Sequence, residues 1–127
     1  MRICCVVTLA VLMGFFAVAI SFPQQRPLND VRHECEELCR CGEIISAFHL
    51  AMKSWQESQR KYGKGHPQTA ACMVTVADVA MHREKYYLAD QLYWKALSIE
   101  EPALGPSHPD VVHCKQALAD LRDNHGQ

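Results

Sequence analysis

The segment HECEELCRC (His33–Cys41) has the densest set of potential metal ligands in the sequence. It holds one histidine and three cysteines, which are ligands that zinc prefers. Cys35 and Cys39 lie one helical turn apart and could share a metal. Structural zinc sites, however, use two separated ligand pairs, and the sequence offers no matching second pair. We therefore predict no metal and no cofactor.

Two further stretches place glycine, His-Pro and cysteine in the same register: YGKGHPQTAAC (62–72) and LGPSHPDVVHC (104–114). A cysteine–histidine nucleophile would pair His66 with Cys72 or His113 with Cys114. Neither pair comes with an orienting residue or an oxyanion motif, and no phosphate-binding loop is present. We predict that the protein is not an enzyme.

The histidine of each His-Pro pair has a structural interpretation. His66 and His108 each precede a proline that suits the first turn of a helix, where a missing N–H costs nothing. A polar side chain in that place can cap the helix. We interpret both histidines as capping or loop-packing residues rather than chemical groups.

Five cysteines follow the apolar amino-terminal segment, and all five are disulfide candidates: Cys35, Cys39, Cys41, Cys72 and Cys114. An odd number in an oxidising compartment leaves at least one thiol unpaired or bonded to another chain. A disulfide-linked dimer is therefore one alternative. Cys72 and Cys114 occupy equivalent places in the two stretches. Equivalent residues on stacked helices stand about 8–10 Å apart, too far for a bridge, so we interpret them as packing residues.

The amino terminus resembles a targeting segment. Met1-Arg2 is followed by an almost wholly apolar run, Ile3–Ile20, and then by Ser21. This pattern predicts a signal peptide over residues 1–21, cleaved after Ala19 or Ser21. An uncleaved membrane anchor is the alternative, because the run is close to a membrane-spanning length. Residues 22–29 are predicted to be a linker, and the mature chain is expected to be secreted or in the lumen of the secretory pathway.

The composition fits one small globular domain, predicted over residues 30–127. The chain has 127 residues, 49% of them hydrophobic and 21% charged, with a formal net charge of -1. Basic residues are scattered and form no run that could follow a phosphate backbone, so we expect no nucleic-acid partner. A membrane is expected as a partner only if the amino-terminal segment is not cleaved.

Apolar residues after the linker recur at helical spacing, and no strand-like alternation is present. A short helix is predicted from about Val31 to Arg40, followed by four longer ones. The glycines of the two stretches can take the positive φ that ends a helix, and the prolines can begin the next. Pro102 predicts that the third long helix ends or kinks near Glu101.

A 42-residue frame relates the two stretches, and it places residues 28–69 over residues 70–111, with a partial third unit over residues 112–127. Small residues recur in this frame, starting from Cys35, and allow the two helices of a pair to approach closely. The positions that define the repeat are Ala47, Ser54, Gly63, His66, Pro67, Ala77, Ala89, Ala96, Gly105, His108, Pro109 and Ala119.

Small residues twelve and then seven apart are the signature of the tetratricopeptide repeat (TPR). The text ADQLYWKALSIEEPALGPSHPDV (Ala89–Val111) resembles the 42-residue TPR subtype of the kinesin light chain family. The resemblance implies an all-α fold, a short α-solenoid of about two and a half helix pairs. It also implies a concave groove that binds a peptide or protein partner.

Two features depart from the kinesin light chain pattern. The heptad run of its coiled coil is absent, and its paired peptide-binding asparagines fall at Val74 and Thr75. We therefore expect a non-catalytic interaction module whose groove is lined by Val74, Asp78, Met81 and His82. The alternatives are a disulfide-linked oligomeric structural or effector protein, and a truncated fragment of a kinesin-light-chain-like protein.

Overall fold

The structure, a computed structural model, describes residues 27–125. The expected signal peptide and residues 22–26 of the expected linker lie outside this range. The described residues form the helices α2 (Leu28–Arg40), α3 (Ile44–Tyr62), α4 (Pro67–His82), α5 (Tyr86–Leu104) and α6 (Pro109–His125). The predicted all-α fold is confirmed.

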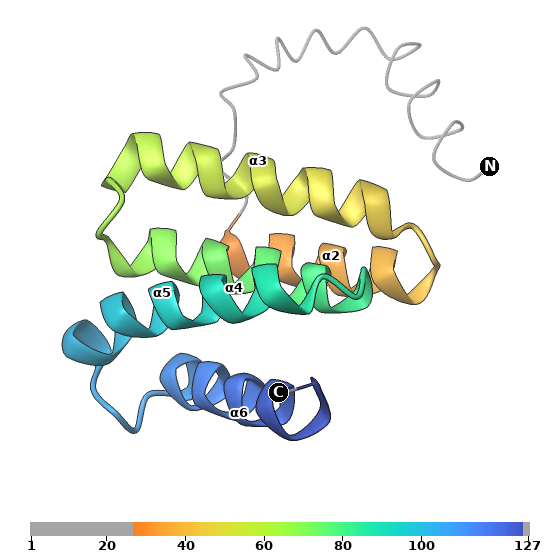
Figure 1. Cartoon of the computed structure of the whole chain (residues 1–127). Coiled ribbons are helices and arrows are strands. Elements are labelled where there is room, and N and C mark those ends of the chain that lie inside the picture. Colours follow the sequence, from red (N-terminus) through yellow and green to blue (C-terminus); the bar gives the residue numbers. More distant parts are fainter. Residues whose placement is uncertain (1–26, 126–127) are drawn as a thin grey trace, which may run out of the picture.

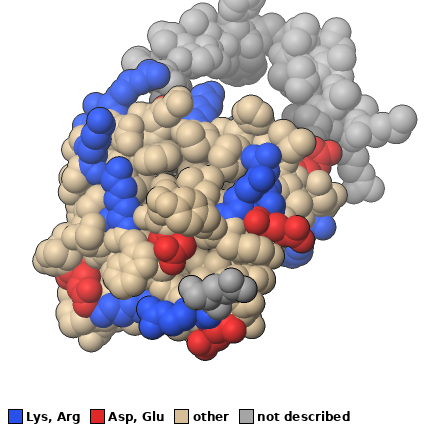
Figure 2. Space-filling view, viewed as in Figure 1, with Lys and Arg blue, Asp and Glu red and all other residues tan. Residues whose placement is uncertain are grey.

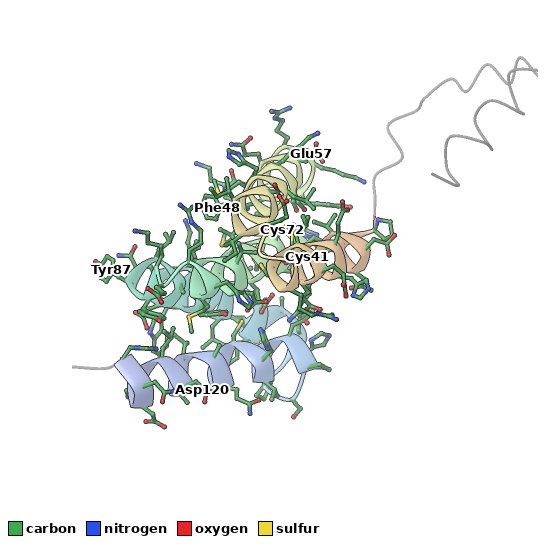
Figure 3. All side chains as sticks on the ribbon, turned by 90° about the vertical axis from the view of Figure 1, so that its right-hand side faces the viewer. Cys41, Phe48, Glu57, Cys72, Tyr87 and Asp120 are labelled. Atoms are coloured by element: carbon green, nitrogen blue, oxygen red, sulfur yellow. The ribbon has the colours of Figure 1, made fainter. Side chains whose placement is uncertain are left out.

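Each helix packs against the next in an antiparallel pair, and α2 also packs against α4 (Figure 1). The arrangement is that of a short TPR solenoid. Viewed along the helices, α4 lies in the middle with Cys72 at the centre, while Tyr87 on α5 and Asp120 on α6 point outward (Figure 3). Ten of the sixteen residues of α4 are buried. A helix that is apolar on every side must be covered on every side, so α4 forms the centre of the core.

The small residues of the repeat lie where the helices meet. Four alanines are fully buried in the core: Ala47, Ala77, Ala89 and Ala96. Cys35 is buried with them, while Ser54 is half-buried and its Oγ lies 3.4 Å from Cys72 Sγ. Ala119 is exposed, because no helix of residues 27–125 packs on that side of α6.

Two glycines end the second helix of each pair. Gly63 has φ 91° and Gly105 has φ 90°, a conformation that L side chains rarely adopt. Their N–H groups donate to Gln59 O and Glu101 O, each at 3.0 Å. The chain can therefore leave the helix sharply while the last carbonyls remain bonded.

The two histidines of the His-Pro pairs cap the helices that follow. His66 Nδ1 accepts a hydrogen bond from the backbone N–H of Gln68 at 3.1 Å. His108 Nδ1 accepts one from the N–H of Asp110 at 3.2 Å. In both places the imidazole satisfies an N–H that has no partner within the helix. This is the capping role that their position before proline predicted.

Two helix boundaries differ from the predictions. The first helix begins at Leu28, not near Val31, so the last two residues of the expected linker are helical. Of the predicted end or kink near Glu101, the end is wrong, because α5 continues through Pro102 to Leu104. A proline in the last turn removes only one backbone hydrogen bond, and its fixed φ is compatible with a helix.

The surface over α3 and α5 carries charges of both signs. Figure 2 shows Lys and Arg along its left edge, interspersed Asp and Glu, and uncharged surface between them. Among the helices of residues 27–125, none has both the length and the apolar character needed to span a bilayer.

Candidate functional site

Asp78 on α4 is contacted by side chains from three other helices. The Tyr93 hydroxyl of α5 donates a hydrogen bond to Oδ1, and His113 Nε2 of α6 lies 3.0 Å from the same oxygen. Arg32 of α2 places Nη2 3.6 Å from Oδ2. One carboxylate thus ties α2, α5 and α6 to the central helix.

Arg32 extends this network to two more carboxylates. Its Nη1 lies 3.8 Å from Asp110 Oδ1, and its Nε lies 3.7 Å from Glu36 Oε1. The hydrogen bond to Asp78 raises the pKa of His113, although burial of the ring opposes this. Alternate helices α2, α4 and α6 are therefore joined by charges on one face.

The four residues predicted to line the groove lie in different environments. Val74 is buried with 2% of its surface exposed, and Asp78 is engaged by the network. Met81 is half-buried against the core, and His82 is exposed at the end of α4. The role of these four residues in partner binding stays a prediction.

A broad groove of about 1300 Å³ lies at the amino end of α4. Within residues 27–125, the 13 residues of α2 are too few to follow all 19 residues of α3, so the last turns of α3 line the groove. Its lining residues come from α2, from α3 and from both joints of the solenoid, and they include Leu50, Tyr62, Gln68, Leu104 and His108. Hydrophobic spacing alone did not predict this groove, since it depends on the relative lengths of two helices.

A smaller pocket adjoins the groove and contains a buried acid. Glu100 on α5 has no exposed surface. Its Oε2 lies 3.5 Å from the thiol of Cys114, whereas its Oε1 has no hydrogen-bond partner among the described residues. Burial raises the pKa of Glu100. The pocket lies directly beside the groove, because the two share four lining residues: Leu28, Asn29, Ala71 and Asp110.

The five cysteines of the described residues have free thiols and differ in exposure. Cys35, Cys72 and Cys114 are buried, and burial raises the pKa of each thiol, that of Cys35 to about 11. Such thiols stay protonated and are poor nucleophiles. Cys39 is half-buried, and Cys41 is exposed at the turn before α3.

The possible chemical pairs of the sequence do not come together in the structure. His66 caps α4, His113 faces Asp78, and the Cys114 thiol faces Glu100. Within HECEELCRC, Cys35 faces the core while Cys41 faces solvent. Residues 27–125 contain no group of three or more side chains placed to hold a metal ion.

The helix packing agrees with a comparison to known protein families. Residues 69–110 match the tetratricopeptide repeat family. This segment covers nearly all of α4, the whole of α5 and the joint to α6. The central helix pair is therefore a tetratricopeptide repeat. A search of curated proteins gave no match to the chain.

Proposed function

We propose that this protein is a non-catalytic interaction module that binds an extended segment of a partner protein in the groove at the amino end of α4. TPR units typically bind other proteins, and residues 69–110 match that family. The observation that carries the proposal is the open groove beside this repeat. Its length across several helices suits an extended chain rather than a small ligand.

Partly exposed apolar side chains in the groove give the partner places to anchor. Tyr62 and Leu104 are 43% and 36% exposed, and both line the groove. Aromatic and large apolar residues that become fully covered provide most of the free energy of a typical protein interface. Polar lining residues such as Gln68 can then fix the register of the bound main chain.

The test is a screen of an immobilised peptide library, followed by affinity measurements on two tyrosine variants. Tyr62→Ala removes an anchor from the groove, and we expect it to weaken the selected peptides at least about tenfold. Tyr87→Ala is the matched control, because Tyr87 is 77% exposed on α5 and does not line the groove. Equal loss in both variants, or loss only in Tyr87→Ala, would argue against this groove.

We propose further that the module acts in the secretory pathway or outside the cell. The support is the sequence of residues 1–21, which has the pattern of a signal peptide. Mass spectrometry of the secreted product would give the cleavage site and the disulfide map. A mature chain found in the cytosol would instead favour the fragment of a kinesin-light-chain-like protein, a subtype that rests on the text of residues 89–111.

The exposure of Cys41 supports the second candidate function, a disulfide-linked oligomer. Non-reducing gel electrophoresis distinguishes the two, because only this candidate requires a covalent dimer. The dimer would be lost in Cys41→Ser and retained in Cys72→Ser, since Cys72 is buried. A monomeric band for the wild-type protein would exclude this candidate.

A further inference from the structure

We propose that the pocket beside Arg32, Thr75 and Glu100 is a subsite for a lysine side chain of the bound partner, with Glu100 Oε1 accepting a hydrogen bond from its ammonium group. The inference rests on the proposed function, because the pocket lies beside the groove and shares four lining residues with it. It adds the chemical class of one partner residue.

The starting observation is a buried oxygen with nothing to bind. Glu100 is fully buried, and its Oε1 has no partner among the described residues. Leaving a buried polar atom unpaired is costly, and leaving a charged one unpaired is more so. A group that donates a hydrogen bond to Oε1 would remove this cost.

The preceding repeat serves as an internal comparison. In the 42-residue frame Glu100 corresponds to Ser58, and Val111 corresponds to Thr69. At the first joint the two hydroxyls pair with each other, because Ser58 Oγ lies 3.3 Å from Thr69 Oγ1. At the second joint the hydroxyl is replaced by the apolar Val111, and the polar residue opposite has become a carboxyl. The repeat thus gives Glu100 Oε1 no hydroxyl partner, and the Cys114 thiol contacts the carboxyl only at Oε2.

The charges around the pocket favour a cation. Arg32 faces three carboxylates at 3.6–3.8 Å, those of Glu36, Asp78 and Asp110. Of these three acids only Asp110 lines the pocket, together with Glu100 and Arg32. The lining thus holds two acids, Glu100 and Asp110, and one base, Arg32. Coulomb attraction in a partly buried site therefore favours a positive group.

The size of the pocket selects an ammonium over a guanidinium. Its volume of about 30 Å³ holds roughly one or two water-sized groups. An ammonium is a compact point charge with three donors, whereas a guanidinium is a larger planar fork. Asp110 and the Thr75 hydroxyl line the same pocket and can accept the remaining donors. The apolar stem of lysine can lie along Leu28 and Ala71.

The experiment titrates the whole protein with Nα-acetyl-lysine N-methylamide and follows the side-chain carboxyl carbon of Glu100 by NMR. We expect a saturable shift with the lysine compound. The norleucine and arginine analogues should bind at least about tenfold more weakly, as expected for the loss of a charge-assisted hydrogen bond. Comparable shifts with all three compounds, or none with the lysine compound, would overturn the subsite.

Two variants test the same point from the protein side. Glu100→Gln keeps the shape and removes the charge, and it should lose the preference for lysine. Glu101→Gln is the matched control, because Glu101 is a more exposed neighbour that pairs with Lys115, and it should keep the preference. If Glu100→Gln does not fold, the titrations of the wild-type protein with the three compounds still test the lysine subsite.

The outcome also separates this inference from the proposed function. Library peptides that depend on Tyr62 but show no preference for lysine would refute the subsite and leave the groove. A lysine compound that binds at Glu100 while no library peptide binds would leave the subsite and refute the groove.

Discussion

At the scale of residues, one carboxylate and one arginine hold the solenoid together on the face where alternate helices meet. Asp78 binds Tyr93 and His113 while it pairs with Arg32. These contacts join residues that are far apart in the sequence, so losing them should lower the free energy of global unfolding. The protonation of His113 is the part of this network that titrates near neutral pH.

His113 should therefore make stability depend on pH. Its folded pKa is raised from 6.5, mainly by the hydrogen bond to Asp78. A raised pKa means that the folded state holds the proton more tightly, so this stabilisation is complete below pH 6.5 and is lost as the pH rises through the folded value. Urea unfolding of wild-type protein and His113→Gln over this range should show a wild-type advantage that shrinks with rising pH.

The comparison with His113→Gln isolates the histidine from its neighbours. Arg32, Tyr93, Asp110 and Cys114 also face the cluster around Asp78, but they are present in both proteins. A difference in stability that stays constant or grows with rising pH would contradict the role given to this hydrogen bond.

At the scale of elements, the joints between helix pairs are built alike. Each has a glycine with positive φ that ends one helix and a histidine that caps the next. His66 also stacks on Tyr62, with ring centroids 4.8 Å apart. The joint therefore depends on two separable contributions of one side chain, a capping acceptor and a ring.

Replacing the first joint histidine should lower stability without affecting any metal. His66→Ala is expected to cost about 0.5–2 kcal/mol, the usual cost of losing an N-cap. His66→Asn should retain most of the stability of the wild-type protein, because the asparagine oxygen can accept the same hydrogen bond. Any remaining loss of stability would report the stack of the His66 ring on Tyr62. Chemical denaturation measures all three proteins.

A surface histidine provides the control for this comparison. His49 is exposed on α3, and His49→Ala should change stability by less than about 0.5 kcal/mol. If His66→Ala is no more destabilising than His49→Ala, the joint does not need its cap.

The elements could be predicted from local sequence signals, and the site could not. Gly63 and Pro67 mark a joint wherever they occur in a helical repeat, so the 42-residue frame predicted the helix order. Pro102 led to a wrong helix end, because the effect of a proline depends on how near the end of the helix it lies. From the helical pattern alone, Glu100 would be assigned to the surface. Its burial follows only from the packing of α6, although the change from Ser58 and Thr69 to Glu100 and Val111 was visible in the repeat frame.

At the scale of the whole molecule, the short α2 determines which part of the described surface forms the proposed groove. A first helix as long as α3 would cover the groove with its own side chains. The short helix instead leaves the amino end of α4 and the end of α3 open, next to the pocket of Glu100. In the carboxyl half of α4, Asp78 is instead engaged by Tyr93, His113 and Arg32.

The most direct test of the proposed groove is to map the binding site of a selected library peptide on the protein by amide chemical shifts. If the peptide binds in this groove, we expect perturbations at the groove residues near Tyr62, Gln68 and Leu104, with little change around Tyr87 on the outward face of α5. Perturbations confined to that outward face, with the groove unchanged, would contradict it.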